Sequence, residues 1–220
     1  MKNLGLKSII IISLMFVASL ACAQSGSVYS FIFRIDQELT DYIKVDDKSK
    51  MFLSGYSESD AMPEQLIDSI KLKTENAFTG KLMMPVKMCY HKNKKGNEVS
   101  SVGVNGFLEG LPSNNFSGGK EDCKGSSRFI SLDVQIYASG GTSVTIVNTK
   151  TKLKPRLQIY AKVYDENKNE IWKKDISIND FAKLRSETSY YGSVDVTKSE
   201  VLTPFDIYAM YLMGLNELIK

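Results

Sequence analysis

The amino-acid sequence predicts a single α+β domain, in which a mainly antiparallel sheet carries two helices packed on one face. Several segments alternate apolar and polar side chains, which is typical of strands with one buried face. Two segments, 63–79 and 204–219, instead repeat apolar residues at helical spacing. The alternating segments of the second half follow one another after short polar connections, which favours antiparallel neighbours.

The first 23 residues predict an export signal that is removed from the mature protein. Lys2 and Lys7 provide a positive start, 9–18 is an apolar core, and Ala-Cys-Ala at 21–23 is a small-residue cleavage site. This apolar core is shorter than the roughly 20 residues that span a bilayer. We therefore expect 24–220 to be one domain without a membrane helix, in the periplasm or secreted.

A second interpretation concerns Cys22. Bacterial lipoproteins are cut just before a cysteine that receives lipid, and Ser-Leu-Ala-Cys at 19–22 partly fits their recognition box. The leucine and the small residue stand in the reverse of the usual order. Two outcomes stay open: an outer-membrane lipoprotein with lipid on Cys22, or cleavage after Ala23.

The composition is that of an ordinary globular protein. Of the 220 residues, 43% are hydrophobic and 24% are charged, which argues against a disordered or collagen-like chain. The formal net charge is +3, and removal of Lys2 and Lys7 leaves a nearly neutral chain. Such a chain gives no electrostatic reason to expect a nucleic-acid partner.

In an exported protein, the remaining two cysteines can form a disulfide. Cys89 and Cys123 form an even pair, and disulfides persist outside the cytoplasm. The sequence therefore favours a bridge between them. The alternative is two buried free thiols, which behave as small hydrophobic side chains.

The first half of the mature chain predicts three strands and a helix. Residues 28–35 alternate as a strand, 51–53 form a short strand, and 86–90 form another. The helix 63–79 starts at a proline in its first turn and is expected to end at Gly80. We expect its apolar face to pack on the sheet.

A long loop rich in Gly, Ser and Asn follows, over 103–127. Loops of this length are uncommon in compact domains and are often functional or mobile. Because Cys123 lies inside this loop, a bridge to Cys89 would tether it.

The second half predicts antiparallel strands. Residues 130–137 alternate strictly, the Gly-Gly pair at 140–141 is expected to turn the chain, and 144–146 begin the next strand. Residues 156–164 and 170–178 form two more strands around a polar turn. Their outward positions are polar, which predicts that one face of the sheet is wet.

The segment 179–202 is polar and carries no clear pattern. The helix 204–219 then begins with a capping box, with Thr203 as the N-cap and Asp206 three residues later. It is apolar nearly all round, which predicts burial on more than one side. The covering partner is either the rest of the domain or a second copy of the chain.

Histidine-based chemistry has only His91 to use, because the sequence contains one histidine. Cys89 and His91 lie two apart, so in a strand they share a face and could form a Cys–His contact or half of a metal site. A zinc site needs three or four protein ligands, and no Cys/His cluster supplies them. We expect His91 to lie at an edge beside a lysine-rich turn, and we predict no cofactor and no metal.

Carboxylates are dispersed along the chain. The adjacent pairs at 46–47, 121–122 and 165–166 lie in polar stretches, which is typical of solvated turns. A glycosidase needs two acids that face each other across several ångströms, and the fold alone decides that spacing. A periplasmic hydrolase that uses gathered carboxylates therefore stays open as an alternative.

Five tyrosines form a candidate binding surface. They lie on the polar side of the predicted strands or in the unassigned segment: Tyr137, Tyr160, Tyr164, Tyr190 and Tyr191. Exposed tyrosines build protein- and sugar-binding surfaces. Tyrosine is also a good strand residue, so strand propensity is the alternative explanation.

Two passages carry a resemblance to a known group. Met-Phe-Leu at 51–53 leads into the helix 63–78, and Leu157–Asp165 precedes Glu-Ile-Trp at 170–172 as a hairpin near the terminal helix. This order resembles the α/β domain of bacterial envelope lipoproteins of the CsgG-like and LpoB-like group. The resemblance implies a non-enzymatic role in envelope assembly or regulation.

These observations predict an exported, non-catalytic protein that acts by contact with another envelope or secreted protein. The alternatives are the hydrolase above and a carbohydrate-binding surface protein. A homo-oligomer that forms through the helix 204–219 is also consistent with the sequence.

Overall fold

A computed structural model describes residues 24–40, 62–102, 107–113, 123–144, 148–191, 194–199 and 202–220. The predicted export signal, the Cys22 lipidation site and the short strand at 51–53 lie outside the described residues. Among the described residues, no helix is both long enough and apolar enough to cross a membrane.

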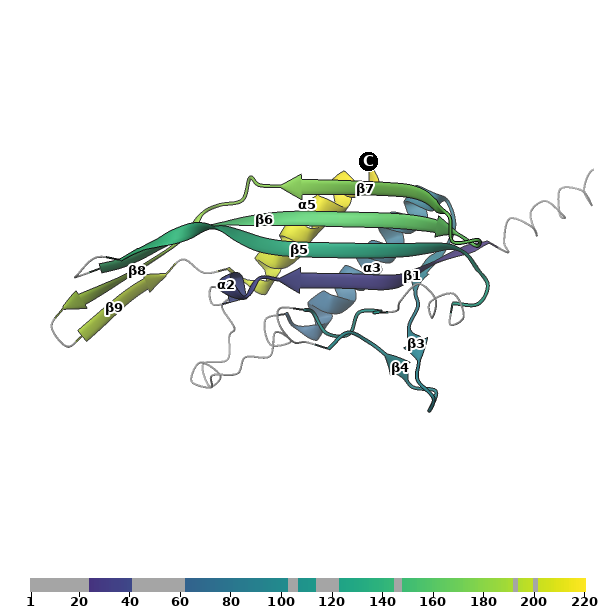
Figure 1. Ribbon diagram of the computed structural model, residues 1–220, viewed down its shortest axis with the longest axis horizontal. Helices are drawn as coiled ribbons and strands as arrows, with labels where there is room; N and C mark the ends of the chain where they lie inside the picture. Colours follow the sequence, from purple (N-terminus) through teal and green to yellow (C-terminus); the bar gives the residue numbers. More distant parts are fainter. Residues whose placement is uncertain are drawn as a thin grey trace, which may run out of the picture.

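Seven strands form one sheet, and a separate two-stranded hairpin projects from the body (Figure 1). The sheet strands are β1 (Ser25–Ile35), β2 (Val86–Met88), β5 (Ser126–Val144), β6 (Asn148–Asp165), β7 (Glu170–Ile178), β8 (Leu184–Tyr191) and β9 (Val194–Ser199). The hairpin is β3 (His91–Lys92) and β4 (Glu98–Val99), and the helices are α2 (Gln37–Thr40), α3 (Glu64–Leu82) and α5 (Pro204–Ile219).

The sheet order is β2-β1-β5-β6, with β7 and β8 sharing the far edge of β6 and β9 pairing β8. β1 runs parallel to both β2 and β5, whereas the other pairs are antiparallel. Parallel neighbours need a crossover connection, which α3 supplies between β1 and β2. The α+β prediction is confirmed, with this parallel part added.

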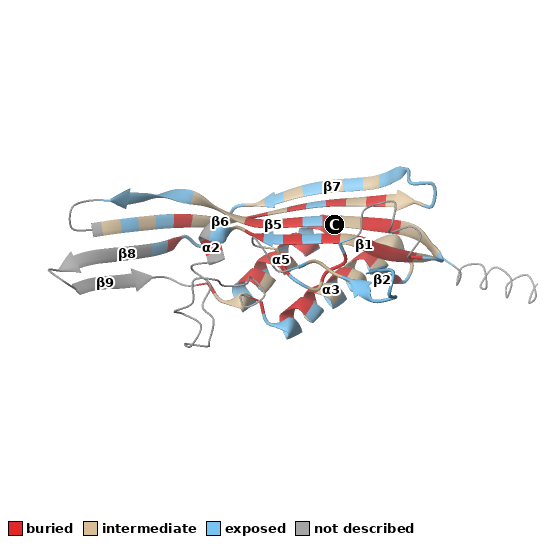
Figure 2. Ribbon diagram, turned by 60° about the horizontal axis from the view of Figure 1, so that its bottom comes forward, coloured by how far each residue is buried: buried red, intermediate tan, exposed pale blue. Residues whose placement is uncertain are grey.

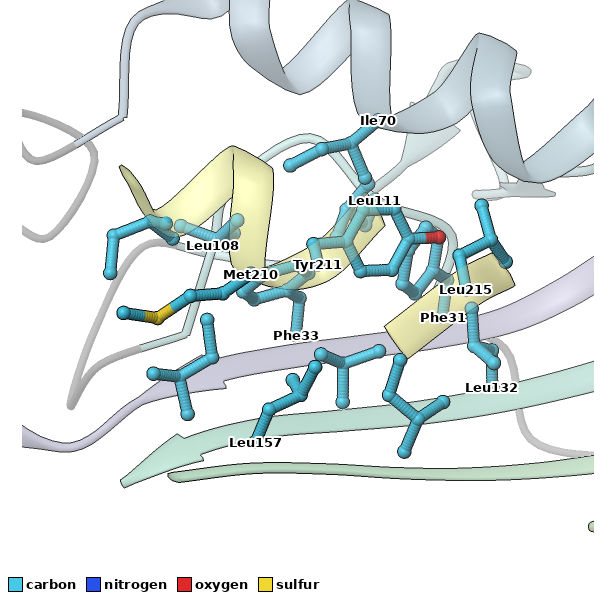
Figure 3. Close-up of a cluster of buried hydrophobic side chains, with 14 of the residues drawn as sticks. Phe31, Phe33, Ile70, Leu108, Leu111, Leu132, Leu157, Met210, Tyr211 and Leu215 are labelled. Atoms are coloured by element: carbon cyan, nitrogen blue, oxygen red, sulfur yellow. The ribbon is translucent and has the colours of Figure 1, made fainter. Parts of the chain in front are cut away.

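Both long helices pack on the same face of the sheet (Figures 1 and 2). Between them and the strands lies the main core, with Tyr211 of α5 at its centre (Figure 3). The Tyr211 ring lies 5.4 Å from the ring of Phe33 and 6.1 Å from that of Phe31. Its hydroxyl shares a hydrogen bond with the hydroxyl of Thr74 in α3. This aromatic contact joins β1, α3 and α5 in one apolar layer.

The capping box of α5 forms as predicted. The Asp206 backbone N–H donates to the Thr203 hydroxyl oxygen, and the Thr203 backbone N–H donates to the Asp206 carboxylate. The expected end of α3 at Gly80 is wrong, because the helix continues to Leu82. Met83 ends it in the left-handed conformation, at φ 54°.

The expected turn at the Gly-Gly pair 140–141 is also wrong. β5 continues through both glycines to Val144 and pairs with β6 along its whole length. A Cβ on Gly140 would collide with the backbone carbonyl oxygen of Lys152. Glycine at this position therefore allows close approach of two strands, which a turn signal in the sequence cannot distinguish.

Part of the predicted loop 103–127 lies along the stretch of the β1 edge that β2 does not pair. The Phe31 N–H donates to the Pro112 carbonyl at 2.7 Å, and the Leu108 N–H donates to the Phe33 carbonyl at 2.8 Å. Leu108 and Leu111 are buried in the main core. Residues 107–113 of this loop thus cover a part of the β1 edge that would otherwise be open to strand addition.

Gly214 allows α5 to approach β6 closely, because a Cβ there would collide with Leu157 and lie 2.6 Å from Ile159 Cδ1. We expect Gly214→Ala to destabilise the protein, since overpacking costs about 1–3 kcal/mol and the gain in helix propensity is about 1 kcal/mol. Gly80→Ala in α3 is the matched control, because no atom lies within 4 Å of its Cβ position. Chemical unfolding should show that Gly80→Ala raises the free energy of unfolding and that Gly214→Ala lowers it. If Gly214→Ala also raised it, the close approach of α5 to β6 would be contradicted.

Candidate functional site

The candidate site is the face of the sheet opposite the helices, and we call it the open face. Figure 1 shows β1, β5, β6 and β7 in front of α3 and α5, with no described helix on this side. The open face is made by Ile32, Arg34, Asp133, Gln135, Tyr137, Arg156, Gln158, Tyr160, Lys162, Tyr164, Lys173, Asp175 and Ser177.

Strand register arranges these side chains in rows. Asp133 of β5 lies opposite Tyr160 of β6, and Tyr160 lies opposite Asp175 of β7. The next row toward the start of β5 places Lys162 opposite Lys173. Paired residues point to the same face, so each row is a group of neighbouring side chains.

Lys162 is the best-connected residue of the open face. Its ammonium group lies 3.0 Å from the Glu170 carboxylate and 5.3 Å from the centre of the Tyr160 ring. Hydrogen bonding to Glu170 raises the pKa of Lys162 above its usual value, and the same bond lowers the pKa of Glu170. Lys173 also reaches Glu170, at 3.6 Å. The ion pair with Glu170 holds the Lys162 ammonium group beside the Tyr160 ring.

Asp133 and Asp175 lie opposite Tyr160 on the two neighbouring strands. Desolvation by the surrounding side chains raises the pKa of Asp133, while the Arg34 guanidinium opposes that shift. The Gln158 side-chain amide donates to the Asp175 carboxylate at 3.4 Å. The two acids lie on the same face of the sheet, on β5 and β7, with β6 between them. This arrangement differs from the carboxylate pair of a glycosidase, whose two acids face each other across a cavity.

One end of the open face is closed by a second apolar cluster. Tyr29, Cys123 and Phe129 are buried there, and Cys89 and Tyr164 pack against them. Cys89 and Cys123 form a disulfide, with their Cα atoms 5.8 Å apart. The predicted bridge is confirmed, and it joins the residue after β2 to the turn before β5.

The disulfide excludes the Cys–His contact that the sequence left open. Because Cys89 is bonded to Cys123, it cannot supply the thiol that a Cys–His contact needs. His91 lies exposed in the projecting hairpin, beside the lysine-rich turn. Among the described residues, no three His, Cys, Asp or Glu side chains are placed to share a metal ion.

Three of the five predicted tyrosines share the open face. Tyr160 is 37% exposed, whereas Tyr137 and Tyr164 are half-buried. Tyr190 and Tyr191 belong to β8, and their side chains lie outside the described residues. That any of the five binds a partner stays a prediction.

Of the carboxylate pair at 165–166, Asp165 has a structural role. The Asp165 carboxylate accepts hydrogen bonds from the backbone N–H groups of Asn167 and Asn169, which closes the turn between β6 and β7. A hydrogen bond from the Asn169 side chain, together with these backbone bonds, lowers the pKa of Asp165. The pairs at 46–47 and 121–122 lie outside the described residues.

Residue-by-residue alternation did not reveal the partner of Lys162. The Glu170 carboxylate reaches the Lys162 ammonium group through the register of β7 on β6, which a β-bulge shifts between Val163 and Tyr164. Tyr29 was missed for a similar reason, since a register irregularity in β1 turns it toward the open face. An even–odd count cannot locate such a bulge.

Tyr29 makes stability sensitive to alkaline pH. Burial raises its pKa from 10.0 to about 12, with the neighbouring Tyr164 adding to the shift. Between pH 10 and 12 the unfolded chain loses this proton while the folded chain keeps it, so stability falls as pH rises, by about 2–3 kcal/mol in all. Urea unfolding at pH 8 and 11 should show about half of this loss, and Tyr29→Phe should reduce it; an unchanged loss in Tyr29→Phe would contradict the assignment.

The chain has a distant structural similarity to a known protein. No protein family matches the sequence, and no curated protein matches it. Among solved structures, the chain is similar to one described as a putative neuraminyllactose-binding hemagglutinin homolog from Helicobacter pylori. That similarity has a TM-score of 0.35 and 8% sequence identity, over 90% of this chain and 84% of the other.

Proposed function

We propose that this chain is an exported, non-catalytic protein that acts by contact with another envelope or secreted protein, through the open face. The observation that carries the proposal is the one-sided covering of the sheet by α3 and α5. No described helix lies on the other side, where charged, amide and tyrosine side chains alternate with the buried core positions.

The chemistry of the open face supports a protein partner. Tyrosine and arginine are enriched among the residues that contribute most to protein interfaces. Here Tyr160 and Arg156 both lie on β6, and Arg34 lies on β1, on the other side of β5. Both signs of charge are present, which suits a partner of complementary pattern more than a uniformly charged polymer.

The proposal includes the resemblance to the CsgG-like and LpoB-like envelope group, whose members have assembly or regulatory roles. The hairpin of β6 and β7 and the terminal helix α5 are the elements on which that resemblance depends. The predicted export signal and the disulfide both fit a compartment outside the cytoplasm, where such bonds persist.

The test uses the mature protein as bait in an extract of the native envelope. We expect it to retain a protein, and the double variant Tyr160→Ala/Lys173→Glu to lose most of it. Lys73→Glu is the matched control, since Lys73 is exposed on α3, on the other side of the sheet. Protease treatment of the extract should abolish capture and glycan removal should not.

Two results would overturn the proposal in favour of the alternatives. Hydrolysis of a wall or glycan substrate by the purified protein, abolished by Asp133→Asn or Asp175→Asn, would establish a hydrolase. Capture that survives protease but not glycan removal would establish a carbohydrate-binding protein.

A further inference from the structure

A second surface, distinct from the open face, lies where β7 ends above the last turns of α5. It is an open groove of about 1100 Å³. Residues of both elements and of the segment after β7 line it, among them Ile178, Asp180, Met213, Asn216 and Ile219. Apolar groups make up the larger part of its surface, and Met213 is 50% exposed.

One wall of the groove is an edge strand. Among the described strands, β7 pairs with β6 alone, so its outer edge has no strand partner. Figure 1 shows β7 as the outermost strand of this part of the sheet. An unpaired edge presents backbone N–H and C=O groups that an extended chain can pair with.

The other wall is fixed in place by two lysines. Lys174 of β7 donates to the Glu217 carbonyl at 2.7 Å, and Lys81 of α3 donates to the Ile219 carbonyl at 3.3 Å. Both bonds satisfy carbonyl groups at the C-terminal end of α5, where a helix leaves them unpaired. The distance between the strand edge and the last helical turn is therefore set before a ligand arrives.

The charges of the groove select its occupant. Glu217 is neutralised by Lys220, whose ammonium group lies 2.5 Å from its carboxylate. Asp180 forms no ion pair with any described residue. A ligand that presents a cation to Asp180 and an apolar side chain to Met213 and Ile178 complements this pattern.

We propose that the groove between β7 and α5 binds an extended peptide segment of a partner protein, with aliphatic side chains at alternate positions and a lysine or arginine near Asp180. The segment continues the sheet at the outer edge of β7. Alternate side chains of an added strand point to one face, so its aliphatic residues enter the groove together. The groove is open and larger than a usual small-molecule site of about 300–1,000 Å³, which suits a chain segment better than an enclosed ligand.

The experiment is a fluorescence anisotropy titration of the mature protein with a labelled peptide, acetyl-Lys-Val-Thr-Val-Thr-Val-amide. We expect saturable binding that Met213→Glu weakens by about tenfold or more, because a charge then enters the apolar part of the groove. Asp180→Asn should weaken binding by about three- to tenfold, and added salt should have the same direction of effect.

Leu72→Glu is the matched control. Leu72 is an exposed aliphatic residue of α3, 54% exposed, and does not line the groove. Its affinity should equal that of the unsubstituted protein within about twofold. A peptide N-methylated at alternate residues tests strand addition, because it lacks the N–H groups that pair with the edge; two such peptides cover both registers, and at least one should bind about tenfold more weakly.

The open face and the groove are tested separately, since Tyr160→Ala/Lys173→Glu should leave this peptide affinity unchanged. Absence of saturation at 1 mM peptide would overturn the proposal. So would equal affinity of the Met213→Glu and Leu72→Glu proteins, or full affinity of both N-methylated peptides. Self-association that Met213→Glu abolishes would assign the groove to a second copy of the chain and would equally overturn it.

Discussion

Replacement of Tyr211 by alanine is expected to lower the free energy of unfolding by about 3–5 kcal/mol, the usual cost of removing a large buried aromatic ring. The side chain is fully buried between Phe31, Phe33 and Thr74, and three elements meet around it. A cavity at this point would loosen α5 from both β1 and α3. Chemical denaturation followed by circular dichroism measures the loss.

A hydroxyl-specific cycle separates packing from hydrogen bonding at the same position. Thr74→Val alone leaves the buried Tyr211 hydroxyl without its partner, at a cost of about 1–3 kcal/mol. The double variant Thr74→Val/Tyr211→Phe removes both hydroxyls and should recover most of that loss. A double variant as unstable as the sum of the single variants would contradict the pairing. Burial also raises the pKa of Tyr211, as expected for a phenol that stays neutral inside the core.

Removal of the disulfide is expected to have a similarly large effect. Cys89 and Cys123 are 34 residues apart. A bridge that closes a loop of this length lowers the chain entropy of the unfolded state and so raises the free energy of unfolding by roughly 4 kcal/mol. Cys89→Ser/Cys123→Ser should therefore lower the melting temperature. Trypsin should also cleave at Lys124 faster, because the turn that holds it is no longer tied to the segment after β2.

Reduction of the unsubstituted protein is the control for the serine variant. The reduced protein and Cys89→Ser/Cys123→Ser should melt within a few degrees of each other. No change in melting temperature on complete reduction would show that the second apolar cluster holds this end of the sheet without the bridge.

Much of the fold was predictable because local pattern and tertiary packing agree. Strict alternation over 130–137 matches the buried side of β5, and the capping box at Thr203 starts α5 at the predicted residue. The pairing of Cys89 with Cys123 followed from compartment and number. In each of these cases the local sequence pattern and the tertiary structure favour the same conformation or pairing.

The errors fall where a distant partner overrides local preference. The Gly-Gly pair at 140–141 lies inside a strand because Lys152 approaches Gly140 across the β5–β6 ladder. The unassigned segment contains β8 and β9, which pair with β6 and with each other, although their sequence is mostly polar and shows no clear apolar alternation. Parallel pairing of β1 depends on the α3 crossover and has no sequence signature of its own.

The candidate site was half predictable. Alternation placed Tyr137, Tyr160 and Tyr164 on the polar side of the sheet, and the predicted packing of both helices on one face is confirmed. Alternation could not bring Glu170 to Lys162, because a bulge sets that register. The groove between β7 and α5 joins residues about 35 positions apart and left no pattern in the sequence.

The most direct test of the open face is site-specific photocrosslinking in native cells, with a benzophenone side chain at position 173 or at position 73. Lys173 is exposed on the open face, whereas Lys73 is exposed on α3. A discrete protein adduct at 173 that is missing at 73 is the predicted result. The same adducts at both positions, or adducts at 73 alone, would contradict a partner-binding role for the uncovered side of the sheet.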